Sequence, residues 1–341
     1  MTMKRLGGRA THGLAIGLAA AGVFASILGG CQQTGGGDVR MATEPICTGA
    51  QAISSTNLYG TSLPMKTLSL SFDDGPGART AELSTYLGAQ GIAAAFFVNG
   101  KMLGAGTAVL QQLVADGHVV ANHTQTHASL TGRATGGAAL SAQEIVAEIA
   151  QTDAIIAPFV QTNRFLFRAP YGDFDAQTAA AVDASAMKKY VGPINWDIGD
   201  HMGPDQAADW DCWRPATDGV VLTTQQCGDL YVKEIDSVGR GIVLLHDPYF
   251  VDEDPAKGGT VDMIKYIVPI LKTKGYKFVR LDDVPDIAAL LPAAPADAGA
   301  DGAASSSSDA QSSSSSSGTS ASPGVDSSAG TAPCAARNST K

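Results

Sequence analysis

The 341-residue sequence lacks the glycine-rich loops that cradle phosphates, since it contains neither GxGxxG nor GxxxxGK followed by Ser or Thr. It also has no CxxC pair, so neither a thiol redox site nor a zinc–thiolate site is indicated. Lys and Arg number 23 against 33 Asp and Glu, and the net charge is −10, which argues against nucleic acid as a partner. Histidine is scarce, with six residues, so any two at metal-ligand spacing are informative.

Two adjacent carboxylates stand at the end of a predicted strand. In Leu68–Phe72, apolar residues alternate with serines as in a strand, and Gly75-Pro76 breaks it just after Asp73 and Asp74. Two neighbouring like charges are costly unless a cation lies beside them. The carboxyl ends of strands are also where α/β enzymes keep their chemistry. We therefore expect one aspartate to hold a metal and the other to remain free as a base.

Two histidines follow a second predicted strand, at residues 118–121. His123 and His127 are four residues apart, and on a helical turn both rings would lie on one face and reach the same ion. Two surface histidines in a polar loop would have the same spacing. Because Asp73 and Asp74 are also present, the favoured interpretation is a catalytic metal site made of histidines and a carboxylate.

Three more candidate functional features stand at or near the ends of predicted strands. Arg168 could hold a carboxylate through two parallel hydrogen bonds, although a surface turn would look the same. His246 ends an apolar strand and is a candidate general acid. The segment Trp196-Asp197-Ile198-Gly199-Asp200-His201 closes another strand and could supply an aromatic wall and a carboxylate that orients an imidazole.

Strand-like and helical patterns alternate between residues 64 and 292. The expected strands are 67–72, 94–98, 118–121, 165–167, 190–196, 241–245 and 277–281. The expected helices are 78–90, 107–116, 142–157, 176–186 and 260–274, the third beginning with a capping box of Ser141 and Glu144. This alternation predicts a parallel sheet, either open or closed into a barrel.

Both ends of the chain differ from this middle region. Residues 1–30 have the basic start and apolar core of an export signal, and Leu28-Gly29-Gly30-Cys31 resembles a bacterial lipoprotein cleavage box. We expect export and acylation of Cys31, which would anchor the protein to the membrane of the cell envelope; a secretory signal with a chance cysteine is the alternative. Residues 31–63 are expected to be a flexible tether, and residues 293–341 a disordered Ser/Ala-rich tail.

Four cysteines remain once Cys31 is set aside for lipid. In an oxidising compartment they permit two disulfides and three pairings. Cys212 with Cys227 is the local choice, and Cys47 with Cys334 would then tie the two flanks together. The sequence leaves the pairing open.

Four segments resemble, in order and spacing, motifs of the polysaccharide deacetylases, the NodB-homology group or carbohydrate esterase family 4. These segments are Phe72-Asp73-Asp74-Gly75-Pro76, His123-Thr124-Gln125-Thr126-His127, Arg168-Ala169-Pro170-Tyr171-Gly172 and Leu244-Leu245-His246. The resemblance covers about residues 64–292 and implies an α/β fold, a deformed (β/α)7-type barrel.

The resemblance implies a divalent metal, most commonly Zn²⁺ with Co²⁺ as a substitute, held by Asp74, His123 and His127. It implies that Asp73 takes the proton from the attacking water and that Arg168 holds Asp73 in place.

The remaining implied roles concern the substrate. The backbone N–H of Tyr171 would stabilise the oxyanion, and His246 would protonate the departing amine. Leu244 would line the acetyl pocket, and Tyr171 and Trp196 would contact substrate. The expected activity is N-deacetylation of an N-acetylglucosamine polymer, peptidoglycan or chitin-like, by a monomer. O-deacetylation of xylan-like chains, or glycan binding without catalysis, are the alternatives.

The fourth motif departs from the family pattern of Asp-x-x-Asp-Trp after a strand-ending Trp. Here Trp196 is followed by Asp197 and Asp200, while the next Asp-Trp pair is Asp209-Trp210. An insertion could separate the pieces. The sequence therefore leaves open which aspartate orients the candidate acid or the candidate arginine.

Overall fold

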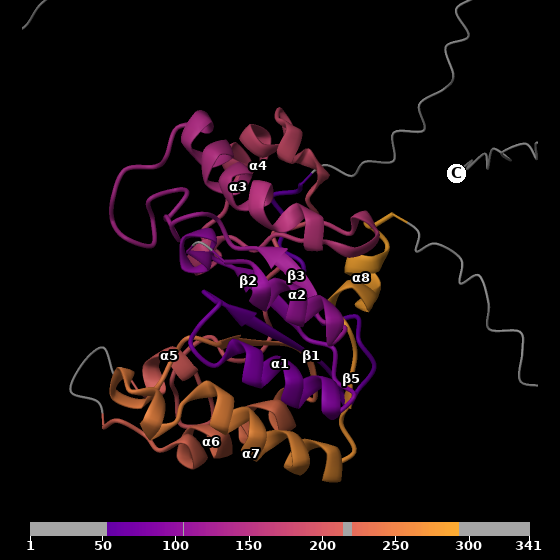
Figure 1. Cartoon of the computed structure of the whole chain (residues 1–341), viewed down its shortest axis with the longest axis vertical. Coiled ribbons are helices and arrows are strands. Elements are labelled where there is room, and N and C mark those ends of the chain that lie inside the picture. The colour runs from indigo at the N-terminus through magenta and orange to yellow at the C-terminus, as the bar shows by residue number, and fades with distance from the viewer. Residues whose placement is uncertain (1–52, 105, 214–219, 293–341) are drawn as a thin grey trace, which may run out of the picture. The chain divides into compact units, whose positions relative to one another are not determined.

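The computed structural model describes residues 53–104, 106–213 and 220–292 (Figure 1). Among the helices in these ranges, none is both long enough and apolar enough to cross a membrane. Several expectations lie outside the described residues, namely the signal segment 1–30, acylation of Cys31, the first part of the tether, the pairing of Cys47 with Cys334 and the tail 293–341.

Five parallel strands make up the sheet, in the order β3–β2–β1–β4, with β5 also paired to β1. They are β1 (Thr67–Asp73), β2 (Ala95–Val98), β3 (Val119–Asn122), β4 (Arg240–His246) and β5 (Lys277–Phe278). β4 pairs with β1 along its whole length. β2 pairs with the last three residues of β1 and β5 with the first two, so these two strands share the other edge of β1.

Two irregular segments close the sheet into a ring. Phe167 bridges the end of β3, and its neighbour Leu166 bridges Val191. Further along the second segment, Ile198 bridges Val243 of β4. All these bridges are parallel, but each is single, so two of the seven expected strands are reduced to isolated pairs. The fold is therefore the deformed, barrel-like α/β fold that the family resemblance implied.

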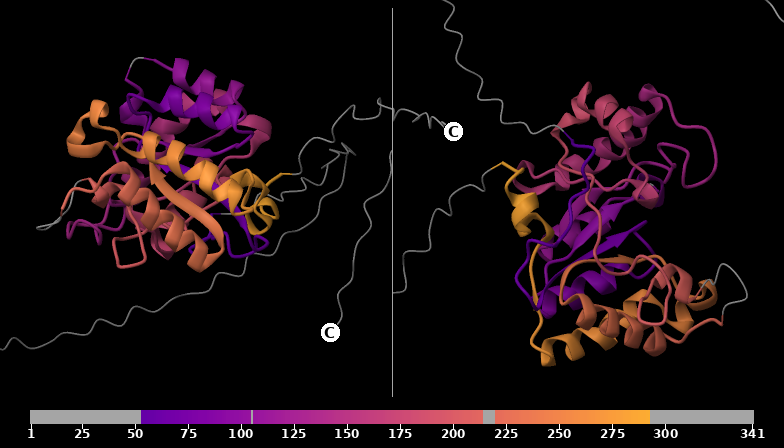
Figure 2. Two further views of the ribbon diagram at one scale, coloured as in Figure 1. Left: turned by 90° about the horizontal axis from the view of Figure 1, so that it is seen from below. Right: turned by 180° about the vertical axis from the view of Figure 1, so that it is seen from behind.

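Eight α-helices occur in the described ranges, with five of the longer ones at expected positions. They are α1 (Thr80–Ala89), α2 (Ala108–Ala115), α3 (Ala142–Ile156), α4 (Ala176–Asp183), α5 (Asp209–Cys212), α6 (Thr224–Val238), α7 (Thr260–Thr273) and α8 (Pro285–Ala288). In Figure 1, α3 and α4 lie beyond one edge of the sheet and α6 and α7 beyond the other. Figure 2 shows the same domain from below and from behind.

The alternation in β1 sorts its side chains between the helices and the inside of the ring. Leu68, Leu70 and Phe72 belong to the apolar cluster that α1, α2, α6 and α7 share. Ser71 and Asp73 therefore point the other way, into the ring, where both are buried. The strand thus delivers a carboxylate to the carboxyl end of the barrel interior.

Residues 53–63, which we expected to be part of a flexible tether, instead pack against the domain. Ile53 and Leu63 are buried in two different apolar clusters. The backbone N–H of Leu58 donates to the carbonyl of Pro193 at 2.9 Å, and the N–H of Asn195 donates back to Leu58 at 2.8 Å. Apolar residues within this Ser- and Thr-rich stretch dock it against the domain, so the domain begins before residue 64.

Candidate active site

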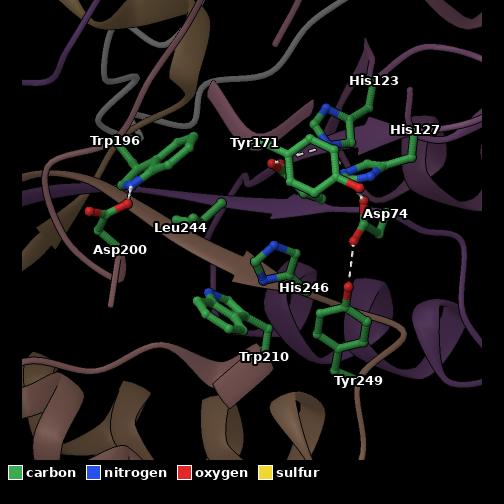
Figure 3. Close-up of a pocket in the computed structure, with 11 residues that line it drawn as sticks. Asp74, His123, His127, Tyr171, Trp196, Asp200, Trp210, Leu244, His246 and Tyr249 are labelled. Atoms are coloured by element: carbon green, nitrogen blue, oxygen red, sulfur yellow. Dashed lines mark hydrogen bonds and ion pairs between the residues drawn. The ribbon is translucent and has the colours of Figure 1, made fainter. Parts of the chain in front are cut away.

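The carboxyl ends of β1 and β4 open into a pocket of about 320 Å³. Its lining includes every catalytic, metal-ligating and substrate-binding residue expected from the sequence except Arg168. Three further residues, Asp200, Trp210 and Tyr249, also line it. The lining residues are Asp73, Asp74, His123, His127, Tyr171, Trp196, Asp200, Trp210, Leu244, His246 and Tyr249. In Figure 3 the two histidines and Asp74 lie on one side, Trp196 and Leu244 on the other, and His246 between them.

Asp74, His123 and His127 form a group that could hold one metal ion, with their ligand atoms all within 4.8 Å of one another. Oδ1 of Asp74 is 3.4 Å from Nε2 of His123 and 3.1 Å from Nε2 of His127. This oxygen is buried and accepts no hydrogen bond from the protein. A buried carboxylate oxygen without a donor, facing two imidazole nitrogens, fits a cation.

The tautomer of His123 supports the same conclusion. Its Nδ1 lies 2.9 Å from the carbonyl oxygen of Arg168, which can only accept, so Nδ1 carries a hydrogen and Nε2, which faces Asp74, is the nitrogen left for a metal. Burial lowers the pKa of His127 to about 4, so its ring is neutral. Burial alone would raise the pKa of Asp74, but the imidazoles around it, those of His123, His246 and His127, hold it well below the usual range. One carboxylate and two imidazoles that each turn Nε2 towards it are ligands suited to Zn²⁺.

The turn that carries the two histidines is not helical, contrary to the prediction. Thr124 has a φ of 64° and His127 a φ of 61°, so the chain coils tightly through left-handed positions. Glu148 of α3 holds the turn, accepting hydrogen bonds from the backbone N–H groups of Gln125 and Thr126 at 3.1 and 2.8 Å. The i,i+4 spacing does bring the rings together, but through this turn rather than through a helix.

Left-handed backbone recurs around the pocket. Asp74 has a φ of 67° and Tyr171 a φ of 59°, and each is costly for a residue other than glycine. The ring of Tyr171 lies 4.4 Å from the ring of His127, and the residue is 53% exposed. Such outliers cluster where surrounding structure holds them for a function.

Arg168 is fully buried and anchors Asp73. Its Nη1 donates to Oδ1 of Asp73 at 2.7 Å and to Ser71 at 3.0 Å, and its Nε donates to the carbonyl of Ile194 at 2.9 Å. The guanidinium also lies 4.2 Å from the centre of the Phe97 ring. The expected pair of parallel hydrogen bonds to one carboxylate is not formed, because the fork is shared among several acceptors.

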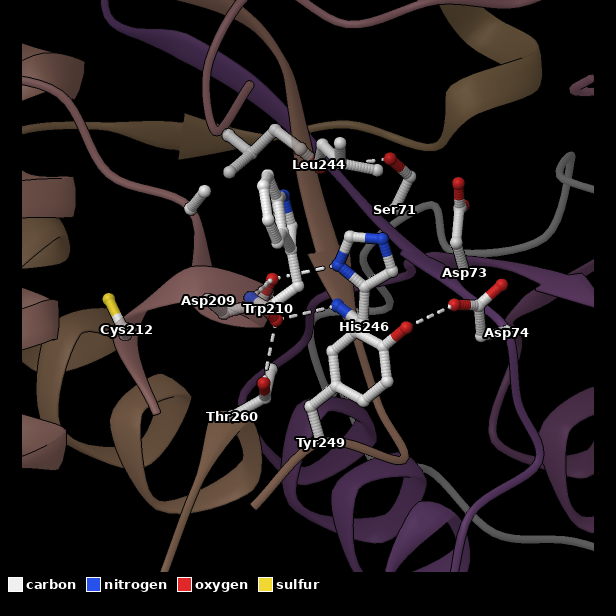
Figure 4. A network of polar contacts seen from close by, with 12 residues as sticks. Ser71, Asp73, Asp74, Asp209, Trp210, Cys212, Leu244, His246, Tyr249 and Thr260 are labelled. Atoms are coloured by element: carbon white, nitrogen blue, oxygen red, sulfur yellow. Dashed lines mark hydrogen bonds and ion pairs between the residues drawn. The ribbon is translucent and has the colours of Figure 1, made fainter. Parts of the chain in front are cut away.

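His246 is paired with Asp209, which answers the question that the fourth motif left open (Figure 4). Nδ1 of His246 lies 2.8 Å from Oδ1 of Asp209. The other oxygen of Asp209 accepts the backbone N–H of His246 at 2.7 Å and the hydroxyl of Thr260 at 2.6 Å. Asp209 is fully buried, so its charge acts on the imidazole at short range with little solvent between.

This pairing sets the protonation of the imidazole. Burial lowers the pKa of His246, but the charge of Asp209 and its hydrogen bond outweigh burial and raise the pKa to about 9. His246 is therefore protonated at neutral pH, with Nδ1 bonded to Asp209 and Nε2 left to donate. This is the state that a general acid needs.

The two aspartates closer to Trp196 have other partners. Asp197 accepts the backbone N–H groups of Gly60 and Ile242 at 2.7 and 2.8 Å and so joins the chain segments behind the pocket. Asp200 accepts the indole N–H of Trp196 at 2.9 Å at the rim. Neither of these contacts involves His246, so of the aspartates that the sequence left open it is Asp209 that orients this imidazole.

The short helix α5, which carries Asp209, is attached to α6. A disulfide joins Cys212 to Cys227, with their Cα atoms 6.0 Å apart, the pairing that the sequence favoured. Tyr231 of α6 accepts the backbone N–H of Asp209 at 3.0 Å and donates its own hydroxyl to the carbonyl of Leu244 at 3.1 Å. Helix α6 therefore supports both the acid's partner and the wall of the pocket.

Sequence reasoning missed three residues that shape the site: Glu148, Tyr249 and Thr260. It named Asp209, through the Asp-Trp dipeptide at 209–210, but did not choose it over Asp197 and Asp200. Glu148, Tyr249 and Thr260 follow no motif and act through contacts across the fold.

Comparisons with known proteins agree with this site. Residues 60–189 match the model of the family described as "Polysaccharide deacetylase". A chitin deacetylase of Pestalotiopsis sp. is 28% identical over 228 residues, 66% of this chain and 65% of that protein. A chitooligosaccharide deacetylase of Bradyrhizobium sp. (strain ANU 289) is 27% identical over 228 residues, 64% of this chain and 90% of that protein.

Solved structures of similar shape include the Bc1960 peptidoglycan N-acetylglucosamine deacetylase, with a TM-score of 0.49 and 20% identity over 69% of this chain and 92% of that one. The chitin deacetylase of Colletotrichum lindemuthianum has a TM-score of 0.48 and 22% identity over 69% of this chain and 91% of that one. The family match and the sequence relatives therefore support a polysaccharide deacetylase domain that includes residues 60–189.

Proposed function

We propose that the protein is a metal-dependent N-deacetylase of polymers that contain N-acetylglucosamine. One observation carries the proposal: a single pocket brings together the group Asp74, His123 and His127 and the protonated imidazole of His246. Relatives named as chitin and chitooligosaccharide deacetylases support an amide substrate rather than an ester.

The metal would be held by Asp74, His123 and His127. Zinc is the favoured ion, because catalytic zinc sites are built from three such protein ligands and keep a coordination position for water or substrate. When bound, a divalent ion lowers the pKa of water and polarises the oxygen of the acyl group. Oδ1 of Asp74, which has no donor in the protein, is the atom that it would satisfy.

The chain's own groups would complete the reaction. Asp73, held by Arg168 at 2.7 Å, accepts the proton of the attacking water as the new C–O bond forms. The backbone N–H of Tyr171 stabilises the negative charge on the acyl oxygen. Nε2 of His246 then gives its proton to the nitrogen as the C–N bond breaks. Acetate and a free sugar amine are the products.

Two side chains would shape the acetyl subsite. Leu244 lines the pocket with only 3% of its surface exposed, so it offers a dry apolar contact for the acetyl methyl. Trp196 offers an aromatic face on the same side, as sugar rings favour (Figure 3).

The substrate proposed is an envelope polymer such as peptidoglycan or a chitin-like chain. This rests on the sequence of residues 1–31, which would export a monomeric enzyme and anchor it to the membrane through a lipid on Cys31. A lipid-anchored enzyme meets such polymers first.

The test measures acetate release by the full chain, stripped of metal and then given zinc or cobalt. Substrates are N-acetylglucosamine oligomers, peptidoglycan and acetylated xylan. We expect release from the first two only with metal, and a loss of about 10²–10⁴-fold in Asp73→Asn with metal binding kept. Unchanged turnover in Asp73→Asn would refute the mechanism. Release from xylan alone would make the protein an O-acetyl esterase, and metal binding without any release would indicate a glycan-binding protein.

A further inference from the structure

We propose that Tyr249 is a positioning residue that fixes Asp74 in the orientation needed to bind the metal through one oxygen. Its hydroxyl donates to Oδ2 of Asp74 at 2.7 Å, from the segment just after β4 (Figures 3 and 4). The inference deepens the proposed function, since it rests on the same metal site.

The two oxygens of Asp74 face different partners. Oδ1 faces the Nε2 atoms of His123 and His127 and accepts no hydrogen bond from the protein. Oδ2 points the other way and is occupied by the phenol. A carboxylate held in this manner presents Oδ1 alone to the metal. It would therefore occupy one coordination position of the ion, whereas a carboxylate bound through both oxygens would occupy two and leave fewer for water and substrate.

Tyr249 is itself held firmly, so the hydrogen bond is pre-organised. Its ring stacks on the ring of His246, with centroids 4.9 Å apart and planes 24° apart. Its carbonyl accepts the backbone N–H of Thr260 at 3.2 Å, and the next residue, Phe250, forms an antiparallel bridge with Gly259. A side chain at position 259 would place its Cβ 2.4 Å from the carbonyl oxygen of Tyr249, so this close approach requires glycine.

Thr260 contacts both the tyrosine that holds the metal ligand and the aspartate that holds the candidate acid. Its N–H binds the carbonyl of Tyr249, while its hydroxyl donates to Oδ2 of Asp209 at 2.6 Å. One residue at the start of α7 therefore fixes both the tyrosine behind the metal ligand and the aspartate behind the acid.

The test is the metal affinity of Tyr249→Phe in the full chain, measured by competition with a chelator for zinc, without substrate. We expect the dissociation constant to rise by about 10–100-fold, as when contacts behind a ligand are removed. The visible absorption of the cobalt-loaded protein should also change, because freeing Oδ2 alters the coordination. Tyr266→Phe is the matched control, since it removes another tyrosine–aspartate hydrogen bond of 2.7 Å on the surface, to Asp229, and should change neither reading.

A dissociation constant within threefold of the wild type would overturn the inference. A lower melting temperature of the metal-free protein at unchanged affinity would overturn it too, since it would indicate a purely structural role. Asp74→Asn separates this failure from that of the proposed function. If Asp74→Asn also binds zinc normally, the metal site itself is wrong, and the role of Tyr249 is refuted with it.

Discussion

On the metal side of the pocket, the ligands come from two short segments, each directly following a regular strand: Asp74 follows β1, and the histidine turn follows β3. On the acid side, the surroundings of His246 come from α5, α6, β4 and the start of α7. The first arrangement is local in sequence and the second is not. The metal ligands can thus be predicted from sequence motifs, whereas the residues that surround His246 are brought together only by tertiary packing.

The difference extends to how firmly each side is held. The strands β1, β2 and β3 are buried along their length and paired by regular ladders. Helix α5 has only four residues, too few to be stable alone, and keeps its place through the disulfide and Tyr231. We expect the acid side to loosen first when distant contacts are removed.

Removing a metal ligand should have the largest effect. His127→Asn deletes the imidazole, while asparagine tolerates the φ of 61° at this position. Zinc affinity should fall by more than the ~10–100-fold expected from losing a contact behind a ligand, and activity should fall with it. His201→Asn, which removes a histidine whose side chain is 57% exposed, is the control. Equal zinc content in both variants after dialysis would contradict the assignment of the ligands.

Breaking the acid side should leave the metal in place. Asp209→Asn keeps the shape but removes the charge that raises the pKa of His246 to about 9. Because the raised pKa keeps the acid protonated until pH passes that value, activity should persist to alkaline pH in the wild type. In the variant, the alkaline limb should move towards the ordinary histidine pKa of about 6.5, with activity about 10²–10⁴-fold lower. The pH profile of kcat/KM and a zinc titration measure both effects, and an unmoved limb would refute the role of Asp209.

Opening the disulfide should weaken the acid side selectively. Cys212→Ala with Cys227→Ala frees a loop of 15 residues, which should lower the free energy of unfolding by about 3 kcal/mol. Denaturant unfolding measures this loss, and reduction of the wild type should reproduce it. Zinc affinity should not change. A loss of zinc binding equal to the loss of stability would mean that the two sides are not independent.

Local periodicity predicted the parallel sheet because burial in this domain follows it, whereas the deformed barrel was implied by the family resemblance. Seven apolar runs correspond to five strands and two bridged segments, and the capping box of Ser141 and Glu144 begins α3 as expected. Metal and acid residues could be predicted because each directly follows such a run.

The rest could not be predicted, for physical reasons that differ by residue. The fifteen residues of α6 were not expected as a helix because few are strongly apolar, although the capping box of Thr223 and Gln226 and the left-handed Gly239 mark its ends. Asp209 lies farther from Trp196 along the sequence than the family pattern of Asp-x-x-Asp-Trp leads one to expect. Glu148 and Tyr249 act across 22 and 175 residues of sequence, where no spacing rule applies.

The two capping boxes test the difference between the two sides of the pocket through the smallest expected change in stability. One capping box begins α3 on the metal side, and the other begins α6 on the acid side. Ser141→Ala should lower the free energy of unfolding by about 1 kcal/mol, the usual effect of losing such a cap. Thr223→Ala should have a smaller effect, because Cys227 lies in the first turn of α6 and the disulfide limits fraying there.

Reduction should remove that difference between the two variants. Without the disulfide, the first turn of α6 depends on its cap, so Thr223→Ala should then cost about 1 kcal/mol while the effect of Ser141→Ala stays the same. Unfolding of the four combinations, reduced and oxidised, measures the coupling directly. If Thr223→Ala costs the same in both states, the disulfide does not support α6, and the acid side is held by the contacts of Tyr231 and Thr260 alone.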